Sequence, residues 1–237
     1  RSNIVLLDGA GAGKTVSSYK IQELLSLETS REKVFGDKLP RVILRWEKRN
    51  LPETKSSNPT LKELLLADRS LEETVKKFHA SIDKLVDYLL ESKRLVILVD
   101  AYDELDVSQR DVLSSVHKNS NSQSQSALWI ITGRDYAINR ETGPQGLFSP
   151  VFRRLRIEPF SNELQNEYMD QALGKLTFKQ QLFESLGSQG WRGCLVGFGK
   201  SGNAWQELLK LPHNLKTLAQ LFENWKPGTP LPRFESP

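Results

Sequence analysis

Apolar residues along the first 159 positions alternate between short continuous runs and longer stretches with helical spacing. The short runs predict strands at residues 3–7, 41–46, 95–99 and 127–132, with a fifth strand around residues 155–157. The helical spacing predicts helices over residues 16–27, 70–93 and 107–117. Strands that alternate with helices are typical of an α/β fold, in which crossover helices cover both faces of a parallel sheet.

Two segments in the first part of the chain match the capping box, in which a hydroxyl and a carboxylate satisfy the free amides of a helix start. They are Thr60-x-x-Glu63 and Ser70-x-x-Glu73. The second is expected to open one long helix that runs to about Lys93, because apolar residues keep helical spacing throughout this stretch.

The pattern changes after Pro159, since residues 161–225 contain only helical periodicity and a Gly-rich break at 187–202. Thr177-x-x-Gln180 predicts a further helix start. We therefore expect an α/β domain over residues 1–159, a small all-helical domain over 160–225, and a Pro/Gly-rich linker over 226–237. Because the chain begins without Met and ends in this linker, we expect it to be a piece of a longer protein.

Composition narrows the class of protein. Hydrophobic residues make up 38% and charged residues 26%, which is typical of a globular chain and argues against disorder or a coiled coil. The longest apolar runs have the length of strands, so no membrane segment is predicted. A single cysteine, Cys194, excludes an internal disulfide, argues against a Cys-rich zinc site and favours a reducing, cytoplasmic location.

The segment from Asp8 to Thr15, with the sequence DGAGAGKT, lies between the first predicted strand and the first predicted helix. Glycines let backbone amides turn toward a phosphate, and the helix N-terminus adds the positive end of its dipole. Lys14 is expected to reach the β- and γ-phosphates, and the Thr15 hydroxyl to bind Mg²⁺. The predicted nucleotide-binding residues here are Gly9, Ala10, Gly11, Ala12, Gly13, Lys14, Thr15 and Val16.

Asp8 departs from the P-loop pattern, which has glycine at this position. A carboxylate ~7 Å from one phosphate charge costs roughly 2 kcal/mol at an effective dielectric constant near 20. We therefore expect the Asp8 side chain to point outward and to accept a hydrogen bond from a loop amide.

A second acidic motif follows the apolar strand at residues 95–99. Asp100 ends this strand, which is a Walker B arrangement, and is expected to hold Mg²⁺ beside the P-loop. Asp103 and Glu104 come just after it, in position to orient or deprotonate an attacking water. The alternative for this motif alone is a solvated acidic turn after a core strand.

Together, these motifs resemble the NACHT family of signal-transducing P-loop ATPases, one of the STAND class of NTPases. The stretch from Trp129 to Asp135 is similar to that family's sensor 1, which implies that Arg134 approaches the γ-phosphate; Gly133 stands where the family has serine. The alternative for Arg134 is a surface ion pair. The segment from Leu155 to Ser161, followed by Tyr168, resembles the junction into the family's first helical domain. Pro212 resembles the proline that packs against adenine, although it would serve equally as a helix boundary.

The resemblance implies an ATP- and ADP-binding module with slow, Mg²⁺-dependent ATP hydrolysis. It further implies self-association on activation, and effector and sensor domains elsewhere in the same chain. Immune, antiphage or cell-death signalling is the family's usual setting.

Two other functions remain open from the residues. The first is a P-loop motor that acts on nucleic acid, which only the basic cluster at 153–156 and the net charge favour. That charge is +4, from 33 basic and 29 acidic residues, and forms no obvious block, so nucleic acid is not the expected partner. The second is an interaction scaffold that no longer binds nucleotide, because Asp8 disables its P-loop.

Overall fold

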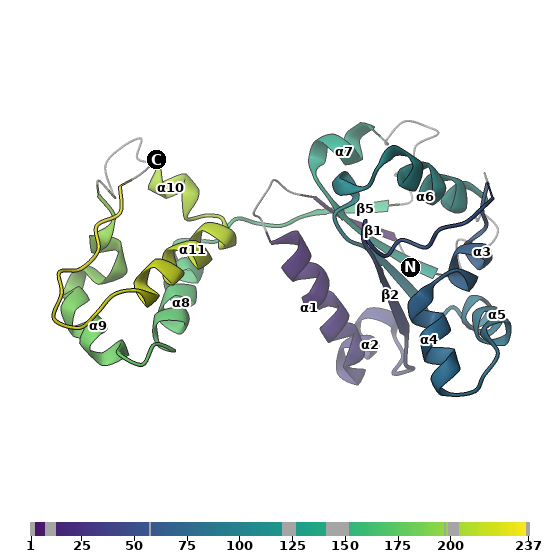
Figure 1. The fold of residues 1–237 in the computed structure, drawn as a ribbon, viewed down its shortest axis with the longest axis horizontal. Helices are drawn as coiled ribbons and strands as arrows, with labels where there is room; N and C mark the ends of the chain where they lie inside the picture. Colours follow the sequence, from purple (N-terminus) through teal and green to yellow (C-terminus); the bar gives the residue numbers. More distant parts are fainter. Residues whose placement is uncertain are drawn as a thin grey trace. The chain divides into compact units, whose positions relative to one another are not determined.

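The computed structural model describes residues 3–7, 13–56, 58–119, 127–140, 152–196, 198 and 204–235. The chain forms two compact units: residues 3–7 and 14–157 belong to the first, and the residues from Glu158 onward belong to the second (Figure 1).

One parallel sheet, in the strand order β2-β3-β4-β1-β5, organises the first unit. Its strands are β1 (Asn3–Leu7), β2 (Val42–Trp46), β3 (Leu95–Val99), β4 (Ala127–Gly133) and β5 (Phe152–Arg156). Each neighbouring pair is parallel. The predicted α/β fold with a parallel sheet is therefore confirmed.

Helices cover both faces of this sheet. They are α1 (Lys14–Ser26), α2 (Glu28–Phe35), α3 (Leu61–Leu66), α4 (Arg69–Lys77), α5 (Ile82–Ser92), α6 (Val107–Asn119) and α7 (Asp135–Arg140), with a 3₁₀ turn, η1, at Tyr102–Glu104. Central strand β3 is buried throughout and sends alternate side chains to opposite faces. Val96 and Leu98 pack on the side of α1, whereas Ile97 packs on the side of α3 and α5. The first unit thus has the three layers expected of a P-loop core.

The prediction of one long helix to Lys93 is wrong, because the helix is interrupted between α4 and α5. His79 in the break has φ of 50°, a left-handed conformation that no helix contains. Phe78, one of the apolar residues of this stretch, is 77% exposed. Helical spacing continued across the break because both helices bury apolar residues against the same core.

Of the two predicted capping boxes, Thr60 and Glu63 form one at the start of α3, whereas Ser70 caps no helix. Asp68 caps α4 instead, because its Oδ1 accepts hydrogen bonds from the amides of Ser70 and Leu71 at 2.9 and 3.0 Å. Its other oxygen accepts a 2.7 Å hydrogen bond from Nε1 of Trp46 in β2. This buried carboxylate therefore joins the helix start to the sheet.

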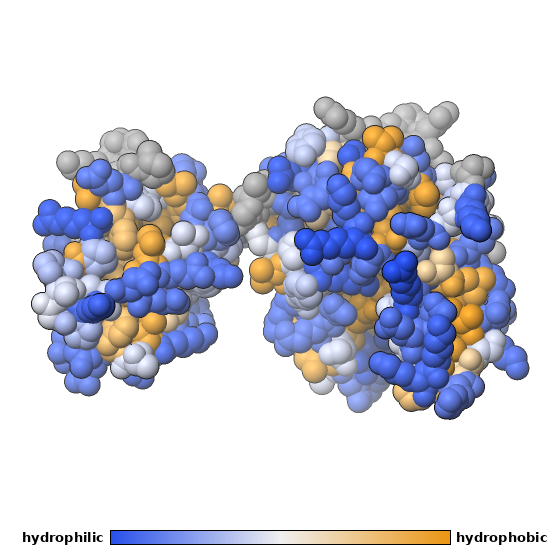
Figure 2. Space-filling model, in the orientation of Figure 1, coloured by the Kyte–Doolittle hydropathy of each residue, from blue (hydrophilic) through white to orange (hydrophobic). Residues whose placement is uncertain are grey.

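The second unit is helical, as expected. It contains α8 (Asn162–Leu173), α9 (Lys179–Leu186), the 3₁₀ segment η3 (Gly187–Cys194), α10 (Trp205–Leu208) and α11 (Pro212–Glu223). Met169, Leu182, Leu215 and Phe222 lie at its core. The helix start predicted at Thr177 is wrong, since α9 begins after Phe178 without a side-chain cap. Hydrophilic residues cover most of the surface visible in Figure 2.

The Pro/Gly-rich stretch after Trp225 packs against the second unit rather than leaving it as a linker. The Phe234 amide donates a 2.8 Å hydrogen bond to the Cys194 carbonyl, and the Val196 amide donates one of 2.9 Å to the Phe234 carbonyl. The Phe234 ring also contacts the Phe222 ring, with 5.4 Å between centroids. These contacts make residues up to Phe234 part of the helical fold.

Within the described ranges, we find no helix whose length and apolar character would let it cross a membrane.

The capping role of Asp68 gives a test of the first unit's fold. Asp68→Ala removes the α4 cap and leaves the buried Trp46 Nε1 without an acceptor, so it should lower the free energy of unfolding by about 2–4 kcal/mol. Glu73→Ala, at an exposed position of α4, is the matched control and should change it by less than about 0.5 kcal/mol. Urea unfolding followed by circular dichroism measures both; equal losses would contradict the assignment.

Candidate functional site

The carboxyl ends of β1, β4 and β3 lie next to one another at one edge of the sheet. Leu7 of β1 is in register with Gly133 of β4, and Ile131 of β4 with Val99 of β3. Ligands of parallel sheets bind at this edge. The predicted phosphate-binding residues Gly9, Ala10, Gly11 and Ala12, together with Asp8, lie outside the described residues.

Asp100 directly follows β3, at the carboxyl ends of these strands, and is only 2% exposed. Its Oδ1 accepts a 2.7 Å hydrogen bond from the Thr132 hydroxyl, which in turn accepts one of 2.9 Å from the Ala101 amide. The Thr15 hydroxyl, at the start of α1, lies 3.5 Å from the same Oδ1. The two residues predicted to bind the metal are thus brought together, although 85 positions separate them in sequence.

Lys14, the first residue of α1, follows Gly13, whose φ of 90° favours glycine. Val16 is 71% exposed in the first turn of that helix. Pro212 is the first residue of α11 in the second unit, a position that suits proline because no helical hydrogen bond needs its missing N–H. Contact of these residues with a nucleotide stays a prediction.

Arg45 of β2 is a site residue that sequence reasoning missed. Its Nη2 donates a short hydrogen bond to Oδ2 of Asp100, and its guanidinium lies 3.7 Å from the centroid of the Tyr19 ring. Burial lowers the pKa of Arg45, but the hydrogen bonds to Asp100 and Tyr19 outweigh burial and raise that pKa above its ordinary value. The signal in the sequence was one charged residue inside an otherwise apolar strand.

The two acidic residues after Asp100 differ in their surroundings: Asp103 is bound to Arg134, whereas Glu104 is exposed. Asp103 accepts hydrogen bonds from Nε of Arg134 at 2.9 Å and from the Arg134 amide at 3.1 Å, and its side chain is 4% exposed. Glu104 is exposed. Arg134 itself is 42% exposed, so solvent and small ligands can reach it. Its neighbour Asp135 pairs with Arg156 instead.

The donor atoms around Asp100 suit Mg²⁺, which prefers oxygen ligands. One carboxylate and the hydroxyls of Thr15 and Thr132 supply such oxygens. No group of three or more His, Cys, Asp or Glu in the described part of the chain is placed to hold a metal. Mg²⁺ commonly binds through one carboxylate, phosphate oxygens and water, so the residues fit a metal that arrives with a phosphate ligand.

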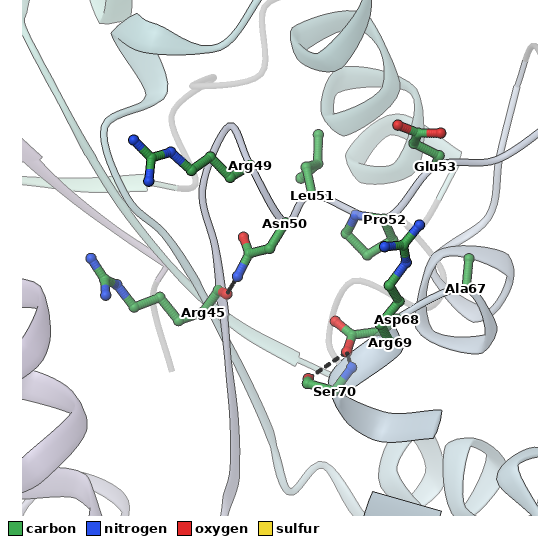
Figure 3. Close-up of a pocket in the computed structure, with 10 residues that line it drawn as sticks. All are labelled: Arg45, Arg49, Asn50, Leu51, Pro52, Glu53, Ala67, Asp68, Arg69 and Ser70. Carbon is green, nitrogen blue, oxygen red and sulfur yellow. Dashed lines mark hydrogen bonds between the residues drawn. The ribbon is translucent and has the colours of Figure 1, made fainter. Parts of the chain in front are cut away.

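Beside Arg45, the structure has a pocket of about 460 Å³ around the loop after β2 and the start of α4 (Figure 3). Arg45 and Arg49 extend to the same side of the view, away from Arg69, so the three guanidinium groups do not converge on one point. Asp68, on the wall, already accepts the hydrogen bonds of the α4 cap. The pocket therefore lacks the geometry of an anion site, and Arg49 is an exposed neighbour of Arg45.

Comparison with known proteins adds a distant likeness. No family model matches the chain, and no curated protein matches it. One solved structure that it resembles is Cdc6p from Pyrobaculum aerophilum, with 16% identity and a TM-score of 0.42. The match covers 70% of this chain and 41% of that one. At this level we base no functional argument on the likeness.

Gly133, the departure from the resembled sensor motif, has a packing explanation. A Cβ at this buried position would lie 3.0 Å from Cδ1 of Ile138 and 3.4 Å from Cβ of Tyr102. Ile138 belongs to the core and is fully buried. A side chain at this position would therefore require the Ile138 side chain to shift, and glycine avoids that.

Gly133→Ser should consequently lower the free energy of unfolding by about 1–3 kcal/mol. Ile138→Val removes the atom in closest contact, so the double variant should lose less than the sum of the two single variants. Urea unfolding of the three variants measures this coupling; strict additivity would contradict the proposed contact.

Proposed function

We propose that this chain is an ATP- and ADP-binding switch module of the NACHT type, with slow Mg²⁺-dependent ATP hydrolysis. The observation that carries the proposal is the approach of the Thr15 hydroxyl to Asp100 at the carboxyl end of the sheet. A P-loop site needs this pairing of a hydroxyl and a strand-end acid, which lie far apart in the sequence.

In this proposal each residue has a separate role toward the bound nucleotide. Lys14 contacts the β- and γ-phosphates, while Thr15 and Asp100 hold the metal. Bound Mg²⁺ would neutralise part of the charge on the phosphates. Pro212 contacts the adenine, as the NACHT resemblance implies.

The contacts of Asp103 favour Glu104 as the residue that activates water. Both oxygens of Asp103 are engaged by Arg134, whereas the Glu104 carboxylate is exposed. A general base must be accessible to the water that it deprotonates. Asp103 then serves as a positioning residue for Arg134.

Arg134 connects the nucleotide state with conformation in this account. The guanidinium of Arg134 pairs with Asp103 in this structure. A γ-phosphate offers a competing anion, so ATP draws Arg134 away and hydrolysis lets it return. The exchange changes the loop after β4 and so biases the chain toward one of two states.

The wider biological role follows the family resemblance. ATP-supported self-association would activate an effector domain elsewhere in a longer chain, under the control of a sensor domain. The setting would be cytoplasmic immune, antiphage or cell-death signalling.

Nucleotide binding is tested by thermal stability. Mg·ADP at about 100 times its Kd should stabilise the protein by about 2.7 kcal/mol, or a Tm increase of about 5–10 °C. Lys14→Ala should lose most of this shift. Lys20→Ala removes an exposed lysine of the same helix and should retain it. Absence of any shift in the parent protein would favour the scaffold alternative.

The role of Glu104 is tested by kinetics. Glu104→Gln should lower kcat for ATP hydrolysis by about 100-fold and leave ATP affinity nearly unchanged, because only the proton acceptor is lost. Glu73→Gln, an equal charge change at an exposed position of α4, is the control. Unchanged kcat in Glu104→Gln would refute this assignment.

A further inference from the structure

The two oxygens of the Asp100 carboxylate face different partners. Oδ1 faces the hydroxyls of Thr132 and Thr15, and the metal is proposed to bind on this side. Oδ2 receives the guanidinium of Arg45 from the neighbouring strand. One oxygen therefore faces the start of α1, while the other is paired with a cation of the protein.

This cation is fixed in place by further contacts. The Tyr19 ring lies 3.7 Å from the Arg45 guanidinium, and Glu47 lies 3.7 Å from its Nη2. Tyr19 follows Thr15 by four residues on α1, so both side chains stand on the same face of that helix. The helix that supplies the metal-binding hydroxyl thus also supplies the ring that holds Arg45.

Burial strengthens the effect of this charge. Asp100 has 2% and Arg45 has 12% of its side chain exposed, so solvent screens the pair weakly. The guanidinium offsets the carboxylate charge that Asp100 offers to a metal, and it repels a divalent cation at Oδ1. A bound polyphosphate brings several negative charges, which more than compensate for one guanidinium.

We propose that Arg45 is a positioning residue that makes metal binding at Asp100 conditional on a bound nucleotide. Its guanidinium keeps Oδ1 directed toward Thr15 and suppresses binding of a divalent cation alone. The inference rests on the proposed nucleotide-binding function. It adds that the metal binds to this site only together with, or after, the nucleotide. Because coupling between ligands is reciprocal, the nucleotide must in turn bind more tightly when metal is present.

The test measures Mn²⁺ affinity of the full chain by electron paramagnetic resonance, with and without ADP. Without ADP, the parent should bind Mn²⁺ weakly, and Arg45→Gln should bind it about tenfold more tightly or better. Arg45→Lys keeps the charge and should stay close to the parent. Adding Asp100→Asn to Arg45→Gln should remove the gain, because the metal then loses its carboxylate.

Arg49→Gln is the matched control, since it removes an exposed arginine from the loop just after β2 without touching the Asp100 pair. Its Mn²⁺ affinity should differ from that of the parent by less than about twofold. Tyr19→Leu, at a position 56% exposed, keeps the test open if Arg45→Gln does not fold. It loosens Arg45 and should raise Mn²⁺ affinity by about two- to fivefold.

The outcomes separate this inference from the function on which it rests. Tighter Mn²⁺ binding without ADP in Arg45→Gln or Tyr19→Leu supports the conditional role. Unchanged or weaker Mn²⁺ binding in both variants overturns it, even where Mn·ADP binds the parent normally; Arg45 would then only support the fold. Failure of the parent to bind Mn·ADP would instead overturn the nucleotide-binding proposal.

Discussion

The structure of the first unit depends on one buried carboxylate, that of Asp100 at the end of the central strand. A charge in this position is costly unless it is paired and hydrogen-bonded. Arg45 supplies the pairing from β2, and Thr132 supplies a hydrogen bond from β4. The carboxylate therefore ties three adjacent strands together at the edge where parallel sheets bind their ligands.

The same carboxylate explains how the site is arranged for chemistry. One oxygen is held by the protein's own cation and the other faces the first helix, so contacts within the protein orient the group. Asp103 and Arg134 form a second ion pair, three residues after Asp100 in the sequence. In this pair the arginine is accessible and the acid is not. In the proposed switch, phosphate and metal would change the partners of groups that are already fixed in place.

The sequence predicted the parts of this site that are local. An apolar run that ends in Asp100, and a glycine-rich loop that ends in Thr15, each carry their own signal. Arg45 carried no comparable signal, because its role depends on β2 lying beside β3, and pairing between strands is not encoded in local spacing. The break after α4 was not predicted, for a related reason. Continuous periodicity shows which face of a helix is buried, but it does not reveal a single left-handed residue such as His79.

The most direct test of the central claim is to identify the nucleotide that the protein carries when purified without added nucleotide, by denaturing it and separating the released compounds by ion-exchange chromatography. The account predicts near-stoichiometric adenine nucleotide, mostly ADP, released together with Mg²⁺. A protein that contains no nucleotide, and that takes up none from Mg·ATP, would contradict the account.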